Sequence, residues 1–373
     1  MQQRVLCVTG EKRVCEGTRY LVRLVGGLRG LGHDVLCFLP EGAQVVSEAV
    51  TGRQWWGFGS RLGSVLFQNE WLRGAAEFQP TLVHACGFEA THAARLLASA
   101  LAVPLVESLF QMPGWLRLRE LRRAGDRAGA DVRSGGTRAC LIASHGKLAQ
   151  YLRARLSGRR VKVEVILPGV LAVPSEAGGE AEGGPPVIGM VAELDGSADV
   201  PLLLRALYLL KEQGVRAECA LIGEGPQEHG LRRLARSLGL RAETHFMTAL
   251  VDPEPVLAET ALVVVLPRRQ LPVLSLLEAQ AAGRAVVAVR VPGIDQFVED
   301  GVTGRLLPRP PRGHPTAQAL AVVMKELLAD AEARRRLGEE ARRRASQSAS
   351  VTAMLEATVA LYDSLTAEVR GTP

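Results

Sequence analysis

The sequence predicts an α/β protein made of two doubly wound domains that face each other across a cleft. Short apolar runs rich in β-branched residues alternate with amphipathic helical stretches almost throughout the chain. Continuous apolar strands of this kind are typical of parallel sheets covered by helices on both faces. The alternation occurs twice, and a length of 373 residues is enough for two domains, each with its own core.

The first half supplies one series of strands. Each candidate is an apolar run bounded by turn or helical sequence, and the candidates include residues 5–9 (VLCVT), 34–39 (DVLCFL), 82–86 (LVHAC), 103–108 (VPLVES), 139–144 (ACLIAS) and 163–167 (VEVIL). We assign residues 1–172 to this first domain.

A boundary follows at residues 173–186, VPSEAGGEAEGGPP, whose Gly, Glu and Pro content predicts an exposed linker. Residues 187–373 are then the second domain, with terminal helices and with strand candidates at 187–193 (VIGMVAE), 218–225 (ECALIGEG), 261–267 (ALVVVLP) and 285–290 (AVVAVR). Ligands of doubly wound sheets bind beyond the carboxyl ends of the strands, so we look for the site there.

Composition argues against one class of function and leaves another open. Aromatic residues make up only 4% of the chain, which argues against a nucleic-acid binder that stacks bases. The net charge is +6, and 40 of the 45 basic residues are arginine. This surplus is compatible with anion recognition through planar contacts and equally with a preference for arginine codons.

The six cysteines are far apart, form no CxxC pair and lie mostly in apolar runs, which indicates reduced, buried thiols. The N-terminus lacks a long apolar stretch, and no run approaches the length of a membrane span. We therefore expect a cytoplasmic protein.

A glycine turn in the second domain is the first candidate for ligand binding. The strand that ends at Ile222 is followed by Gly223, Glu224 and Gly225, and Pro226 stands where a helix can begin. Such a turn can offer backbone N–H groups to an anion, although glycines at this place also serve simple chain reversal. A third glycine is missing, which argues against a dinucleotide-binding dehydrogenase.

The stretch 266–308 carries a more specific pattern. It contains LLEAQAAGRAVVA, then a PG turn that includes Gly293, then VEDGVTGRLLP. These runs resemble the nucleotide-sugar motif of family-4 glycosyltransferases, which have the GT-B fold of two Rossmann-like domains. The runs IGEGP, LRGLGHDV at 28–35, LVHAC and VILPGV at 165–170 resemble the same family in the same order.

The resemblance implies roles for particular residues. Glu278 matches the glutamate that binds the donor ribose, although a glutamate favoured by a helix N-terminus is the alternative interpretation. Gln270 stands at the position of a glutamate that contacts the sugar. The turn Gly223–Glu224–Gly225, Gly293 and either Arg268 or Arg269 complete the implied donor site.

The departures from the family pattern fall on the diphosphate. The family reads roughly GRLxxxKG, and here Glu193 replaces the arginine while Ala198 or Asp199 replaces the lysine. Loss of two charge-assisted contacts costs about 3 to 6 kcal/mol of donor binding. Arg268 and Arg269 could supply the missing charge, or they could simply be solvated. Pro272 also removes one backbone N–H from the loop that should approach the phosphates.

The first domain offers weaker candidates. Phe110 stands where the family often has a histidine, His84 could face the cleft or be a hydrogen-bonded structural residue, and Glu107 is a candidate cleft carboxylate. The arginine-rich stretch Arg117 to Arg138 could rest on anionic lipid at the inner face of the membrane or be a solvated helix face.

The resemblance implies a retaining glycosyltransferase that moves a hexose from a nucleotide sugar to a glycan, lipid or small-molecule acceptor. It implies no metal and no cofactor besides the donor, and we find no metal-ligand spacing. The replaced residues leave a second hypothesis open, a catalytically degenerate relative that binds or assembles with an active glycosyltransferase. The donor base, the sugar and the acceptor stay open.

Overall fold

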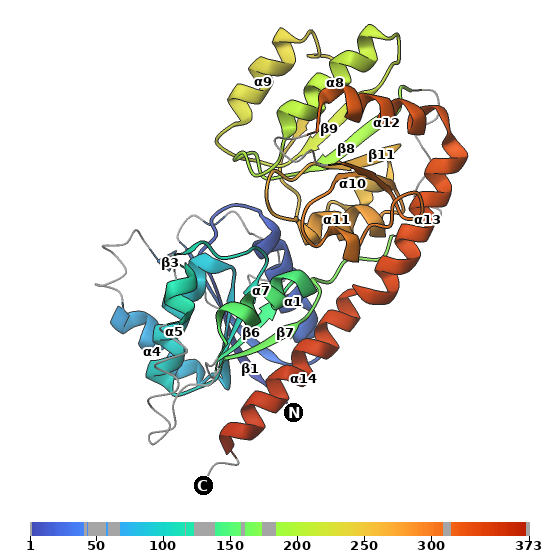
Figure 1. Ribbon diagram of the computed structural model, residues 1–373. Helices are drawn as coiled ribbons and strands as arrows, with labels where there is room; N and C mark the ends of the chain where they lie inside the picture. Colours follow the sequence, from blue (N-terminus) through green and yellow to red (C-terminus); the bar gives the residue numbers. More distant parts are fainter. Residues whose placement is uncertain are drawn as a thin grey trace. The chain divides into compact units, whose positions relative to one another are not determined.

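The computed structural model (Figure 1) describes residues 2–40, 43, 57–58, 68–115, 117–122, 139–157, 161–173, 184–308 and 315–370. The chain forms two compact units, Met1–Gly169 with Val351–Pro373, and Val170–Ser350. Most of the predicted linker, 174–183, lies outside the described residues. The division differs from the expected one at the end of the chain, because the last helix belongs to the first unit.

The first unit has a seven-stranded sheet in the order β3-β2-β1-β4-β5-β6-β7, and all of its pairs are parallel. The order reverses between β1 and β4, as in a doubly wound sheet. The strands are β1 (Arg4–Thr9), β2 (Asp34–Pro40), β3 (Gly57–Phe58), β4 (Leu82–Cys86), β5 (Leu105–Leu109), β6 (Ala139–Ala143) and β7 (Val161–Val165).

Helices cover this sheet, and apolar side chains of strands and helices form its core. Leu6 and Val83 pack in one cluster with residues of α5, while Leu141 packs in another with residues of α7. The helical elements of this unit include α1 (Glu16–Gly30), α4 (Gln68–Phe78), η1 (Phe88–Ala90), α5 (Thr91–Leu101), α7 (Gly146–Arg155) and α14 (Val351–Arg370).

A buried polar network ties α14 to this unit. His84 in β4 hydrogen-bonds through Nδ1 to the Tyr362 hydroxyl of α14, and its Nε2 lies 2.8 Å from the Ser108 hydroxyl. Ser108 in turn donates to the Tyr20 hydroxyl at 3.1 Å. His84 is fully buried, and burial lowers its pKa to about 3. His84 is therefore a hydrogen-bonded structural residue, one of the two interpretations of the sequence.

A close helix contact accompanies the network. A Cβ at Gly27 of α1 would lie 2.2 Å from the Leu355 side chain of α14, so the glycine makes room for that helix. Gln3, before β1, donates to the Asp363 carboxylate at 2.6 Å. These contacts explain why Val351–Pro373 packs with the first unit.

The second unit has a six-stranded parallel sheet in the order β10-β9-β8-β11-β12-β13. Its order reverses between β8 and β11. The strands are β8 (Val187–Val191), β9 (Glu218–Ile222), β10 (Thr244–Met247), β11 (Leu262–Val265), β12 (Ala285–Val289) and β13 (Arg305–Leu307). Two parallel, doubly wound sheets confirm the predicted fold class.

Helices also cover this second sheet (Figure 1). They are α8 (Val200–Glu212), α9 (Glu228–Ser237), α10 (Glu254–Ala258), α11 (Val273–Ala281), η3 (Ile294–Gln296), α12 (Ala317–Ala329) and α13 (Ala331–Ser348). The largest core cluster joins the sheet to α8 and α12. Every residue of α11 is buried, because this helix also packs against α13.

The six cysteines are free and buried, as predicted. In the part of the chain that the structure describes, no helix is both long and apolar enough to span a membrane.

The depressed pKa of His84 predicts a pH dependence of stability. His84 stays neutral in the folded protein, whereas in the unfolded chain it binds a proton below about pH 6.5. The unfolded state therefore gains protons on acidification and the folded state loses stability, by about 2 kcal/mol from this one group at pH 5. Urea unfolding of the wild type and of His84→Gln at pH 8 and pH 5 measures this loss of unfolding free energy.

We expect His84→Gln to be less stable at pH 8 and the gap to narrow by about 2 kcal/mol at pH 5. Parallel pH profiles for the two proteins would contradict this assignment.

Candidate functional site

The carboxyl edge of the second sheet holds the candidate site. All six strands are parallel, so the loops that follow them meet at one edge, and the order reverses between β8 and β11. Ligands of doubly wound sheets bind at such a reversal. Seven of the eight predicted site residues lie in the segments that follow these strands: Gly223, Glu224, Gly225, Arg268, Arg269, Gln270 and Gly293.

The loops after β8 and β9 hold each other through their backbones. Leu194 donates its N–H to the carbonyl of Glu224 at 2.9 Å, and its own carbonyl accepts from the N–H of Gln227 at 2.8 Å. A Cβ at Gly223 would lie 1.9 Å from the carbonyl oxygen of Ala192, and one at Gly225 would lie 2.3 Å from the backbone of Leu194. Close backbone approach therefore requires both glycines.

The loops after β8 and β11 are joined as well. Arg268 donates its backbone N–H to the carbonyl of Ser197 at 2.9 Å, and Asp199 donates its N–H to Leu266 at 2.8 Å. The Arg268 guanidinium donates through Nη2 to Oδ1 of Asp199 at 3.0 Å. The candidate diphosphate arginine is thus bonded to Asp199, one of the two residues that could stand at the family's lysine position.

Sequence reasoning considered Arg268 and Asp199 separately and missed their pairing. The signal that could have found it is topological, because the two residues follow the strands on either side of the reversal.

The exposed part of the β11 loop carries Arg269 and Gln270. In the described part of the chain, Arg269 makes no ion pair. The loops around the reversal also carry four carboxylates, so acidic groups outnumber the two arginines; they are Glu193, Asp195, Asp199 and Glu224. The edge is therefore less favourable to an anion than two arginines alone would make it.

Glu278 differs from the expectation. The sequence placed it at the start of a helix, but α11 begins at Val273, and Glu278 is its sixth residue. The helix N-terminus therefore does not account for a glutamate at this position. The Glu278 side chain is also fully buried. The structure does not bring its carboxylate to the surface with Arg269 and Gln270. A buried carboxylate requires polar partners or a ligand to compensate for lost hydration.

Gly293 ends the β12 loop with a φ of +94°, which glycine adopts without strain, and caps η3. The turn predicted at Pro292 and Gly293 is therefore present in the structure.

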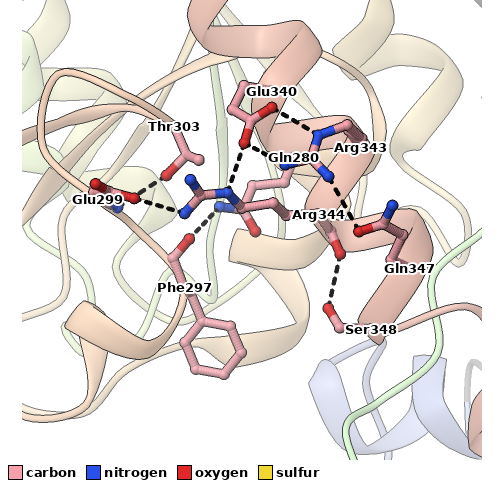
Figure 2. Close-up of polar contacts among 9 residues, drawn as sticks. All are labelled: Gln280, Phe297, Glu299, Thr303, Glu340, Arg343, Arg344, Gln347 and Ser348. Carbon is pink, nitrogen blue, oxygen red and sulfur yellow. Dashed lines mark hydrogen bonds and ion pairs between the residues drawn. The ribbon is translucent and has the colours of Figure 1, made fainter.

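A cavity of about 370 Å³ lies between the η3 region and α13. Figure 2 shows its polar contacts: Gln280 donates to the carbonyl of Phe297 at 2.8 Å, and Arg344 binds both Glu299 and Glu340 at 2.8 Å. None of the eight predicted site residues lines this cavity. The two arginines of its lining, Arg290 and Arg344, are each paired with a carboxylate. The cavity is therefore distinct from the predicted donor site.

The first unit yields no second cluster from the residues singled out by sequence. Glu107 is buried and receives two hydrogen bonds from Arg95, at 2.8 and 3.1 Å. Burial raises the pKa of Glu107 and outweighs the opposite effect of Arg95. Phe110 is buried with its ring 5.1 Å from that of Tyr20. These residues form structural contacts.

The arginine-rich stretch is described only over 117–122, and residues 123–138 lie outside the described residues. Arg117 pairs with Glu89 at 3.1 Å and with Glu120 at 3.2 Å, and Arg122 donates to a backbone carbonyl. Trp115 is 70% exposed beside them.

Comparison with known proteins decides the family. The model of Glycosyltransferase Family 4 matches residues 17–171, and that of Glycosyl transferases group 1 matches residues 175–344. The two models together cover most of the chain. The chain belongs to the family-4 glycosyltransferases.

Curated relatives of this family-4 glycosyltransferase have modest identity. It is 30% identical to D-inositol 3-phosphate glycosyltransferase of Nocardia farcinica over 219 residues, 53% of this chain and 47% of that protein. It is 29% identical to alpha-D-kanosaminyltransferase of Streptomyces kanamyceticus over 161 residues, 42% of this chain and 40% of that protein. The chain thus spans about half the length of the curated relatives it matches.

Solved structures share the fold over nearly the whole chain. Anabaena Alr3699/HepE in complex with UDP and glucose has a TM-score of 0.77 at 19% identity. The superposition covers 98% of this chain and 100% of the Anabaena chain. Sucrose-phosphate synthase of Thermosynechococcus elongatus has a TM-score of 0.74 at 18% identity, with coverage of 98% and 100%. The two doubly wound units of this family-4 glycosyltransferase therefore have the GT-B fold.

The close loop contacts predict that Gly223→Ala and Gly225→Ala are strongly destabilising, by about 2 kcal/mol or more, because each new Cβ would overlap backbone atoms. Chemical denaturation checks this. Gly230→Ala in α9 is the matched control, since nothing lies within 4 Å of its Cβ, and we expect it to be neutral or stabilising by up to about 1 kcal/mol. Equal stability of all three variants would refute the close-approach argument.

Proposed function

We propose that this protein is a retaining glycosyltransferase that moves a hexose from a nucleotide sugar to a glycan, lipid or small-molecule acceptor. The observation that carries the proposal is the meeting of the β8, β9 and β11 loops at the reversal of the second sheet. This is where a doubly wound sheet binds its ligand. The sugar-transferring relatives and the UDP complex of a structural neighbour support the same class of donor.

In this proposal Arg268 and Arg269 contact the diphosphate, since a guanidinium presents several N–H donors to phosphate oxygens. The turn Gly223–Glu224–Gly225 brings backbone close to the donor, and Gln270 hydrogen-bonds the sugar. Gly293 shapes the neighbouring loop. Glu278 accepts from the ribose hydroxyls, which requires a local rearrangement because its carboxylate is fully buried here.

The chemistry assigned to these residues is electrostatic. Cleavage of the bond between sugar and diphosphate leaves charge on the departing phosphate oxygens, and donors aimed at those oxygens stabilise the transition state. The proposal assigns no metal and no cofactor besides the donor. Among the described residues, no group of three or more His, Cys, Asp or Glu side chains is placed to hold a metal.

A second candidate is a degenerate relative that serves as a binding or assembly partner of an active glycosyltransferase. The carboxylates at the edge of the sheet favour it, because Glu193 stands where the family pattern has an arginine and Ala198 or Asp199 stands where it has a lysine. The Asp199 carboxylate also offsets part of the positive charge of Arg268, because the two side chains form an ion pair.

Nucleotide titration separates the two candidates. We expect UDP, GDP or ADP to bind with sub-millimolar Kd in calorimetry. Arg269→Ala should weaken this binding about tenfold or more, because a charge-assisted contact is lost. Glu278→Gln should weaken it through the ribose. Arg335→Ala on α13, where the arginine is already paired with Glu332 and Glu339, is the control and should leave binding unchanged. No heat with any of the nucleotides would favour the degenerate relative.

The stereochemistry has its own test. If the enzyme hydrolyses UDP-glucose slowly, proton NMR of the first product should show the α-anomer, which later mutarotates. Initial release of the β-anomer would rule out retention.

We also propose a peripheral contact with the inner face of the membrane through the stretch Arg117 to Arg138. Exposed Trp115 and the exposed Arg119 support it, because aromatic and basic side chains favour the headgroup region. Vesicles with 30% phosphatidylserine should co-sediment the wild type more than a Trp115→Ala, Arg119→Ala double variant. The proposed membrane contact would be contradicted if the wild type co-sedimented no more than the double variant, or if neither protein co-sedimented with the vesicles.

A further inference from the structure

The ion pair between Asp199 and Arg268 joins two loops at the reversal of the second sheet. Their backbones are already fixed to each other by two hydrogen bonds, which together form an antiparallel bridge between Ala198 and Pro267. The two side chains therefore extend from backbone positions that are fixed relative to each other. Such an ion pair constrains the guanidinium more than a pair between two mobile surface side chains would.

Asp199 has a second bond that fixes its carboxylate. Its Oδ1 also accepts from the N–H of Leu202 at 3.3 Å and so caps α8. A carboxylate at a helix N-terminus is stabilised by the unpaired backbone N–H groups there. The acid is thus held by the fold independently of the arginine, and it is suited to orient its partner.

Exposure is unequal in the pair. The Asp199 side chain is 13% exposed, whereas that of Arg268 is 40% exposed. The contact uses the Nη2 group of the guanidinium. The carboxylate lies inward and the cation reaches the surface at the edge where the ligand of such a sheet binds.

We propose that Asp199 is a positioning residue that holds the Arg268 guanidinium for the donor diphosphate. This inference rests on the proposed function and deepens it. It assigns a role to a carboxylate that by charge alone should repel a diphosphate. Two effects of Asp199 therefore oppose each other, and they predict opposite signs when its charge is removed.

The same loop provides a matched control. Asp195 is exposed, its Oδ1 accepts from the backbone N–H of Ser197 at 2.8 Å, and it lies in the same segment after β8. Asp195→Asn and Asp199→Asn remove the same charge at almost the same place. Asparagine caps helices as well as aspartate does, so Asp199→Asn should keep α8 intact.

The experiment is calorimetric titration of the full chain with UDP and with uridine. If Asp199 positions Arg268, Asp199→Asn should weaken UDP binding about fivefold or more and leave uridine binding unchanged. Asp195→Asn should leave UDP binding unchanged or tighten it. In an Arg268→Ala background, Asp199→Asn should cause no further loss, because the residue it positions is absent.

Tighter UDP binding by Asp199→Asn, as for a merely repulsive charge, would overturn the proposal. So would an equal loss with and without Arg268. These failures differ from a failure of the proposed function, in which wild type binds neither UDP nor any other nucleotide. Thermal unfolding of each variant separates a local effect from a loss of fold.

Discussion

Backbone contact between the loops after β8, β9 and β11 is the constraint on which the second unit depends. Parallel pairing brings these loops to one edge, but pairing alone does not fix their paths. The hydrogen bonds of Leu194, Gln227 and Arg268 do so, and they leave no space for a side chain at Gly223 or Gly225. The two glycines therefore allow the loops after β8 and β9 to lie in direct backbone contact.

The arginine surplus has a mainly structural use among the described residues. Arg335, Arg343 and Arg344 pair with glutamates along α13, where exposed pairs add little stability individually. Arg95 neutralises the buried Glu107. Composition therefore says little about anion recognition in this chain. What matters is which arginines follow the strands at the reversal.

The fold was largely predictable because long apolar runs mark buried parallel strands. The short strands Thr244–Met247 and Arg305–Leu307 were missed, since they are brief and partly polar. The shared edge of seven predicted site residues could be predicted because the loops after parallel strands meet there, whereas their role in donor binding stays a prediction. The depth of Glu278 was not, because it depends on where α11 begins and on its packing against α13. Prediction of the ion pair between Asp199 and Arg268 would also have required knowledge of the strand order.

The placement of α14 bears on how the protein is made. Tyr362 and Leu355 of α14 complete the interior of a unit whose seven strands are all translated before the second unit. On the ribosome, the first unit must therefore wait with His84 and the α1 surface at Gly27 uncovered until the last helix emerges. The second unit is contiguous and can close earlier. The interior of the first unit can therefore be completed only after the whole second unit has been synthesised, and its uncovered apolar surface is accessible to chaperones until then.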